Sequence, residues 1–136
     1  MKKLERRINK YDYEQLEALC ATPGKEEEVY LLADVLKRVK PSLLVAHNST
    51  PPQVVTMNSR VLVQNLRTKQ RIEVTLVFPD EADEIENKIS ILEPLGAALL
   101  GYGIGETVQY ATPAGSVWMK IERVCYQPET AGNYTM

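Results

Sequence analysis

The spacing of the apolar residues changes near residue 50, and this change constrains the fold more than any other feature of the sequence. Before it, apolar side chains recur every three or four residues, which is the period of one face of an α-helix. After it, they alternate with polar side chains, as in strands with one buried face. The run between the two patterns, HNSTPP at 47–52, is rich in turn-forming residues. We therefore expect a helical N-terminal part followed by a sheet-forming C-terminal part.

Two helices are predicted in the first part. Asp12 is placed to cap the first helix, which buries Leu16 and ends before Pro23. The second helix has Thr22 as its N-cap, keeps apolar residues at helical spacing and stops at Pro41. A short turn between the helices predicts an antiparallel helical hairpin, a coiled-coil-like arm with one apolar stripe on each helix. At 1.5 Å per residue, a second helix of about 15 residues is only about 22 Å long.

Five strands and one short helix are predicted in the second part. The helix has Pro94 in its first turn and stops at Gly101, where a left-handed backbone favours glycine. The small residues at 96–98 allow this helix to lie close to a sheet. The fold class is therefore α+β, a twisted antiparallel sheet with one short helix packed on it. The expected strands cover residues 60–66, 71–78, 88–92, 106–112 and 116–126.

The same boundaries predict a helical hairpin arm at 1–46, a linker at 47–53 and a folded domain at 54–136. A length of 136 residues is enough for one modest core with an appended arm. The sequence shows neither an apolar run of about 20 residues nor a signal-peptide pattern, so no membrane association is expected. Cys20 and Cys125 lack the spacing of a zinc site or a disulfide framework, which favours a reducing cytoplasm.

The charge pattern gives little reason to expect that the whole chain coats nucleic acid, because the net charge is -2. The first ten residues are an exception, since they contain five Lys or Arg residues and one glutamate. A basic end of this kind can contact phosphate, or it can be a solvated terminus. The sequence leaves both interpretations open.

Three motifs that resemble functional sites have simpler interpretations. The glycines of 101–105 follow a helix instead of preceding one, so they predict a helix stop and a turn, not a phosphate loop. The acidic run at 80–86 lacks the pattern of a calcium loop and predicts a solvated loop. His47, the single histidine, lies in the linker without a nucleophile motif. We therefore predict no catalytic residue, no cofactor and no bound metal.

For two sets of side chains, the sequence leaves a functional role open beside the structural one. Trp118, Phe78 and the tyrosines are able to stack on nucleic-acid bases, but basic residues are not interleaved with them, so packing in the core and the hairpins is favoured. The glutamates at 26–28 lie near the tip of the arm. They complement the helix dipole or, as the alternative, deliver carboxylates to a metal-containing site in another protein.

Several separate blocks of the chain resemble the Gre transcript-cleavage factors, the GreA/GreB family. The resemblance to their C-terminal domain runs through KISILEPLGAALLG (88–101) and TPAGSVWMKIERVCY (112–126). A branch of shorter relatives is similar over more of the chain, through VVTMNSRV (54–61), EPLGAALLG (93–101) and YQPETAGNY (126–134). One such motif would be weak, but together they cover about two thirds of the chain.

The resemblance implies an FKBP-like domain at 54–136 that docks on the rim of the secondary channel of bacterial RNA polymerase core, with the arm pointing into the channel. It implies that contact with DNA or other nucleic acid is weak and confined to the polymerase complex. It also implies that the loop before the short helix takes part in docking, and we expect this loop to matter for binding and little for folding. In this chain the loop consists of Leu92, Glu93 and Pro94.

The arm departs from the family pattern. In the cleavage factors a long coiled coil carries an Asp and a Glu that help to hold a catalytic magnesium ion in the polymerase. Here the segment is much shorter, and its tip consists of Lys25, Glu26, Glu27 and Glu28. The sequence therefore predicts a cytoplasmic, non-enzymatic regulator of transcription that competes with Gre-type factors without stimulating transcript cleavage. The alternatives are a true elongation factor that stimulates cleavage through 26–28 and, from the fold alone, a peptidyl-prolyl isomerase.

Overall fold

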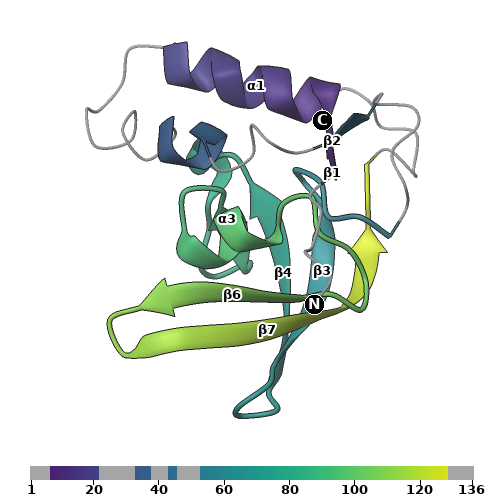
Figure 1. The fold of residues 1–136 in the computed structure, drawn as a ribbon, viewed down its shortest axis with the longest axis vertical. Coiled ribbons are helices and arrows are strands. Elements are labelled where there is room, and N and C mark those ends of the chain that lie inside the picture. The colour runs from purple at the N-terminus through teal and green to yellow at the C-terminus, as the bar shows by residue number, and fades with distance from the viewer. Residues whose placement is uncertain (1–6, 22–32, 38–42, 46–52, 129–136) are drawn as a thin grey trace.

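The computed structural model describes residues 7–21, 33–37, 43–45 and 53–128. Its centre is a five-stranded sheet with the strand order β5-β4-β3-β7-β6. A short helix, α3 (Pro94–Leu99), packs on the sheet, and helix α1 (Lys10–Ala21) lies across one end of it (Figure 1). The strands are β3 (Arg60–Asn65), β4 (Arg71–Val77), β5 (Lys88–Ser90), β6 (Thr107–Thr112) and β7 (Gly115–Tyr126).

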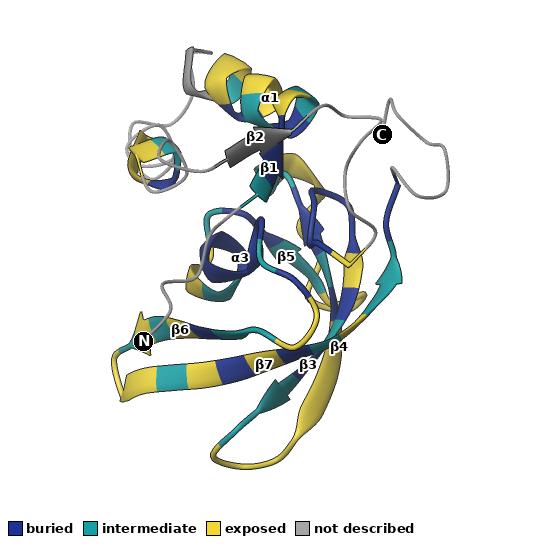
Figure 2. Cartoon of the chain, turned by 45° about the vertical axis from the view of Figure 1, so that its right-hand side comes forward, coloured by how far each residue is buried: buried dark blue, intermediate teal, exposed yellow. Residues whose placement is uncertain are grey.

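The strands follow the alternation of the sequence. In β7, for example, Met119 and Ile121 are buried while Trp118 and Lys120 are exposed. Each of the five predicted strands is present, with its ends within two residues of the predicted ones. Figure 2 shows that the buried residues gather where the sheet faces α3 and α1, whereas the ends of the β3–β4 and β6–β7 hairpins are exposed.

The expectation of a purely antiparallel sheet is wrong for one strand pair, because β5 runs parallel to β4 and the sheet is therefore mixed. Between these two strands the chain reverses twice. The first reversal is the 3₁₀ turn η2 (Pro79–Glu81), and the second precedes Lys88, where Asn87 has a φ of 54°. An antiparallel bridge between Asp83 and Lys88 marks the second reversal. Two reversals restore the original direction, so β5 lies beside β4 without a crossover helix.

Helix α3 approaches the sheet closely because the buried residues at 96–98 are small. A Cβ atom on Gly96 would clash with the carbonyl oxygen of Ser90 and would lie 3.1 Å from Leu76 Cδ1. The helix ends as predicted, since Gly101 follows it with a φ of 86°. The N–H of Gly101 then donates a hydrogen bond to the carbonyl of Val55 (2.9 Å). This bond ties the end of α3 to the buried segment before β3.

The N-terminal part contains two short strands that the sequence analysis did not predict. β1 (Arg7–Asn9) and β2 (Leu43–Val45) pair in parallel, and α1 follows β1 directly. The predicted first helix is confirmed, but its cap is Asn9 and not Asp12. Asn9 Oδ1 accepts a hydrogen bond from the Asp12 N–H (2.7 Å), and the Asn9 amide donates one to Asp12 Oδ2 (3.2 Å). In this reciprocal pair Asn9 caps the helix, and the carboxylate of Asp12, at the third helical position, holds the Asn9 side chain.

Helix α1 shares a core with the sheet domain. Ile8 and Leu16 from the N-terminal part, and Val35 from the helical stretch 33–37, are buried in one cluster with residues of β3, β4, β7 and α3. Since each fully buried aliphatic side chain contributes about 1.5–3 kcal/mol, this packing joins the two parts strongly.

Two polar contacts reinforce the junction. The N–H of Arg7 donates to the carbonyl of Gly101 (2.9 Å), just beyond α3. Asp12 Oδ2 accepts a hydrogen bond from the backbone N–H of Met57 (3.0 Å), and both residues are buried. The carboxylate of Asp12 therefore holds the side chain of the capping residue Asn9 and also fixes the first turn of α1 to the segment 54–59.

Other parts of the predicted architecture stay predictions. These are the division into 1–46, 47–53 and 54–136, the antiparallel helical hairpin and the likeness to FKBP domains. Of the predicted second helix, residues 33–37 are helical, and its expected start at Thr22 lies outside the described residues. Within the described ranges, no helix is long and apolar enough to cross a bilayer.

Candidate functional site

The predicted docking loop joins β5 to α3. Leu92 is half-buried and packs against the core, whereas Glu93 and Pro94 are exposed. Pro94 occupies the first turn of α3, where a backbone N–H would have no partner within the helix, so the lack of this group in proline costs nothing. The loop therefore presents one carboxylate and one proline ring to solvent.

Hydrogen bonds hold this loop in one shape. Glu93 Oε2 accepts a hydrogen bond from the backbone N–H of Ser90 (2.7 Å), and Ser90 Oγ accepts one from the N–H of Leu92 (3.0 Å). The backbone N–H of Glu93 donates to the carbonyl of Ser90 (3.0 Å). Glu93 is thus a structural acceptor as well as an exposed charge. Unlike the removal of a free surface side chain, its truncation is expected to lower stability.

The glycine-rich segment 101–105 forms a turn, as the sequence predicts. It follows α3 and leads into β6, which is the reverse of the order in a phosphate-binding loop. The N–H of Gly103 donates to Glu106 Oε1 (2.7 Å), and the same oxygen lies 3.7 Å from the guanidinium of Arg7. The turn is therefore stabilised from within and linked to β1.

The acidic run at 80–86 is exposed, which confirms the prediction of a solvated loop. Asp83 Oδ1 accepts a hydrogen bond from the N–H of Ile85 (3.0 Å). Glu86 contacts Lys88 (Oε2–Nζ, 3.0 Å), and this hydrogen bond is the main reason why the pKa of Lys88 is raised. In the described part of the chain, no three His, Cys, Asp or Glu side chains gather to hold a metal ion.

Other predicted site residues lie outside the described ranges, so their roles stay predictions. They form the arm tip: Lys25, Glu26, Glu27 and Glu28. His47, which is predicted to be a linker residue without a catalytic role, also lies outside the described residues.

Trp118 is an exception to the packing in the core and the hairpins that the sequence favours for the aromatic residues. It is 50% exposed on the outer face of β7. Beside it, the ends of the two hairpins enclose a groove of about 510 Å³, lined by residues 65–68 on one side and by 112 and 114–118 on the other. The sequence does contain the signal for this position. Because Met119 and Ile121 face the core, the period of two places Trp118 on the opposite face.

The sequence analysis also missed the role of Asp12. The spacing of Asn9 and Asp12 is that of a capping box, and this local pattern would have placed the helix start correctly. The bond from Met57 N–H to Asp12 has no comparable signal, because the two residues are 45 positions apart.

The sheet, α3 and the loop at 92–94 lie within residues 50–126, and this range matches the family described as "Transcription elongation factor, GreA/GreB, C-term". The chain therefore belongs to the GreA/GreB family of transcription factors, as its sequence blocks predict. A solved structure, "Prokaryotic transcription elongation factor GreA/GreB from Nitrosomonas europaea", has the same fold. Its TM-score is 0.70 at 33% identity, over 91% of this chain and 100% of that one.

Within the family, the chain is similar over nearly its whole length to the "Regulator of nucleoside diphosphate kinase" of Escherichia coli (strain K12). The two are 32% identical over 131 residues, which are 95% of each chain. The "Transcription elongation factor GreA" of Clostridium acetobutylicum is 32% identical over 84 residues, which are 62% of this chain and 53% of that protein. The similarity to this GreA is thus partial, whereas the similarity to the regulator includes the N-terminal part.

Proposed function

We propose that the chain binds bacterial core RNA polymerase at the rim of the secondary channel. There it competes with Gre-type factors and does not stimulate transcript cleavage. The family match at residues 50–126 carries the proposal, because that range contains the complete sheet domain and the loop at 92–94. The relatives are named as a regulator or as elongation factors, not as enzymes, which supports action through occupancy of the polymerase.

The proposed contact surface is the exposed part of the loop, Glu93 and Pro94. The loop is closed by the bond between Glu93 and Ser90 (2.7 Å), so little conformational freedom is lost when a partner binds it. A carboxylate in this position favours a partner surface with basic or N–H donor groups.

The proposed lack of cleavage stimulation rests on the sequence of the arm. Magnesium requires oxygen ligands in a nearly octahedral arrangement. Glu26, Glu27 and Glu28 are consecutive, so on a helix their side chains would diverge by about 100° per residue and would not converge on one ion. A misplacement of about 1 Å can lower a rate by about a hundredfold.

The first experiment measures retention of the protein on immobilised core polymerase with a rising concentration of a Gre factor. Glu93→Gln is the informative variant, because its amide oxygen can still accept the Ser90 N–H while the charge is lost. Glu81→Gln removes the same charge from the exposed turn η2 and is the matched control. We expect Glu93→Gln to bind up to about thirtyfold more weakly, as at an interface hot spot, and Glu81→Gln to bind like the wild type.

Absence of retention, or retention that a saturating Gre factor leaves unchanged, would refute the proposed binding site. Retention of Glu93→Gln at wild-type strength would show that docking uses another surface of the domain.

The second experiment incubates a backtracked elongation complex with the protein and follows release of the short 3′ RNA fragment, with a Gre factor as positive control. We expect no release, and slower release when the protein is added together with the Gre factor. Release near the rate of the control would contradict the proposal. It would also make Glu26–Glu28 the leading functional residues, to be tested by their replacement with Lys.

A further inference from the structure

The groove beside Trp118 has the chemistry of a binding site, and polymerase docking through the loop at 92–94 makes no use of it. Trp118 is the single tryptophan of the chain, and half of its surface is exposed. Leu66 and Val117 add apolar surface to the groove, and Thr68 and Ser116 add hydroxyl groups. A volume of about 510 Å³ is within the range of sites that hold small organic groups.

Both walls of the groove are held in place by hydrogen bonds of their own. On the β3–β4 side, Asn65 Oδ1 accepts from the N–H groups of Arg67 (2.9 Å) and Thr68 (3.2 Å). On the β6–β7 side, Thr112 Oγ1 donates to the carbonyl of Gly115 (2.7 Å) and accepts from the N–H of Ala114 (3.2 Å). The groove is therefore formed before any ligand arrives, which reduces the entropy lost on binding.

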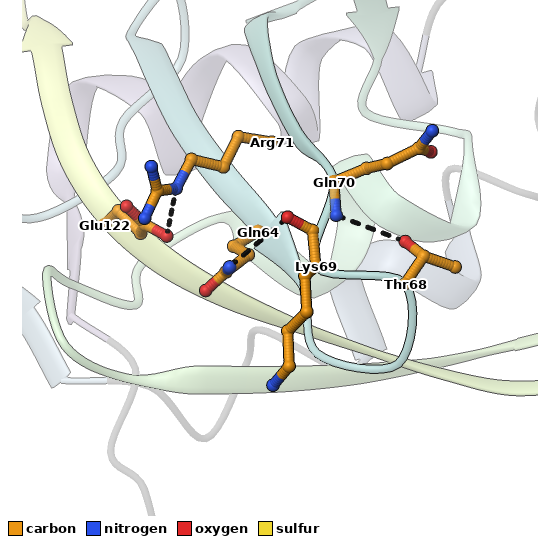
Figure 3. A network of polar contacts seen from close by, with 6 residues as sticks. All are labelled: Gln64, Thr68, Lys69, Gln70, Arg71 and Glu122. Carbon is orange, nitrogen blue, oxygen red and sulfur yellow. Dashed lines mark hydrogen bonds and ion pairs between the residues drawn. The ribbon is translucent and has the colours of Figure 1, made fainter.

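The charges on the two hairpin ends are mainly positive, and Glu122 is the acidic residue that adjoins them. The segments 65–72 and 107–121, which form the two hairpin ends, contain four Lys or Arg residues and no Asp or Glu, although the whole chain has a net charge of -2. Arg71 is neutralised by Glu122 (Nε–Oε1, 3.0 Å), and Figure 3 shows the side chain of Lys69 extending away from this pair. Among the described residues, no carboxylate pairs with the remaining three cations: Arg67, Lys69 and Lys120.

The positive charge continues from the groove across the outer face of the sheet. Trp118 and Lys120 are two residues apart on β7, so they share a face about 6.6 Å apart. Lys120 lies opposite Gln64 of β3 and Thr107 of β6 in the strand register. The exposed ring of Trp118 thus has one cation, Arg67, on the neighbouring turn and a second, Lys120, along its own strand.

We propose that this groove binds single-stranded nucleic acid, with one base stacked on Trp118 and the phosphates on its two sides in contact with Arg67 and Lys120. Proteins that bind single strands combine these two elements, an aromatic platform and a basic track for the backbone. An acidic peptide would satisfy the cations, but it would use the indole only where it carried an aromatic residue, whereas every nucleotide has a flat base. A free nucleotide cannot place phosphates on both sides of its base.

The proposal is independent of polymerase docking, because it concerns the hairpin ends and can be tested on the free protein. Titration with a twelve-nucleotide oligouridine RNA at low salt should quench the fluorescence of Trp118, since no other tryptophan is present. Fluorescence anisotropy of the same RNA, labelled at its 5′ end, gives the affinity of each variant. We expect the affinity to fall steeply with added salt, as phosphate contacts require.

Variants separate the stacking contact from the charge contacts. Trp118→Ala should weaken binding by about 5- to 150-fold, which corresponds to the loss of one stacked base. Arg67→Glu and Lys120→Glu should weaken binding and make it less dependent on salt. Ile104→Ala removes an exposed apolar side chain that precedes β6, whereas the groove lies at the other end of that strand. Lys37→Glu makes the same charge change on the stretch 33–37, and both controls should bind like the wild type.

Melting curves establish that each variant is folded, as expected for substitutions at exposed positions. Unchanged Trp118 fluorescence on addition of RNA, or equal affinity of Trp118→Ala and the wild type, would overturn the proposal. Equal affinities for uridine monophosphate and for the twelve-nucleotide RNA would overturn it in favour of a free nucleotide. Displacement of the RNA by an equal concentration of an acidic peptide would overturn it in favour of a protein partner.

Discussion

Replacement of Asp12 by alanine tests whether a buried carboxylate fixes α1 to the sheet domain. Asp12 is 3% exposed, and its Oδ2 atom accepts hydrogen bonds from Met57 N–H (3.0 Å) and from the amide of Asn9 (3.2 Å). Loss of a hydrogen bond to a charged group costs about 1.5–3 kcal/mol, particularly where the donor stays buried, and Met57 is 1% exposed. The lost hydrogen bond from the Asn9 amide adds about 1 kcal/mol, whereas the cap bond from the Asp12 backbone N–H to Asn9 is kept. We therefore expect a loss of about 3 kcal/mol.

Urea unfolding followed by Trp118 fluorescence and by circular dichroism measures this loss. For 136 residues the entropy of unfolding is about 0.29 kcal/mol/K, so about 3 kcal/mol lowers the Tm by about 10 °C. Asp12→Asn keeps an oxygen acceptor without the charge and should lose less than Asp12→Ala. Glu17→Ala removes an exposed carboxylate from the same helix and should change stability by less than about 0.5 kcal/mol. A loss in Asp12→Ala no larger than in Glu17→Ala would refute the reasoning.

Three further outcomes follow from the packing, the titration and the turns. Gly96→Ala should cost about 2 kcal/mol, because its Cβ would clash with the Ser90 carbonyl. Gly105→Ala has open space around the new Cβ atom but a φ of 88°, and should cost about 1 kcal/mol. Equal urea midpoints for Gly96→Ala and Gly105→Ala would contradict the close approach of α3 to the sheet. Burial raises the pKa of Tyr110 above its ordinary value of 10.0, so its contribution to stability is complete below pH 10 and is lost as the pH rises through the raised pKa. Tyr110→Phe should therefore lessen the fall of Tm above pH 10, and an unchanged fall would assign the titration to another group. Asn65→Ala leaves two N–H groups of the β3–β4 turn without their acceptor and should cost about 1 kcal/mol by urea unfolding; wild-type stability would show that the turn holds without it.

The strands of the sheet and helix α3 were predictable because their signals are local. Buried Val61 and Val63 alternate with less buried neighbours in β3, and Pro94 and Gly101 mark the two ends of α3. The docking role proposed for the loop at 92–94 rests on the resemblance to a family, whereas the bonds within the loop follow a local pattern. Ser90 and Glu93 have the S-x-x-E spacing of a capping box, and here that spacing closes the loop before the helix.

The remaining features depend on contacts between residues far apart in the sequence. The parallel pairing of β5 with β4 follows from two chain reversals. The hydrophobic periodicity of the sequence does not indicate in which direction the chain runs after them. The pairing of β1 with β2 joins three-residue segments that are too short to show an alternation. The groove beside Trp118 exists because two hairpin ends meet, although the exposure of Trp118 itself follows from the alternation in β7.

The pairing of β1 with β2 also determines how this architecture can vary in length. Paired strands lie about 4.8 Å apart, so the chain that leaves the domain after Asn9 comes back on the neighbouring strand, where Leu43 pairs with Arg7 and Val45 with Asn9. The stretch between Asn9 and Leu43 is therefore attached to the strand pair at both of its ends. Because Leu16 and Val35 of this stretch are buried in the core that it shares with the sheet, a change in its length leaves the fold intact only where it spares these contacts.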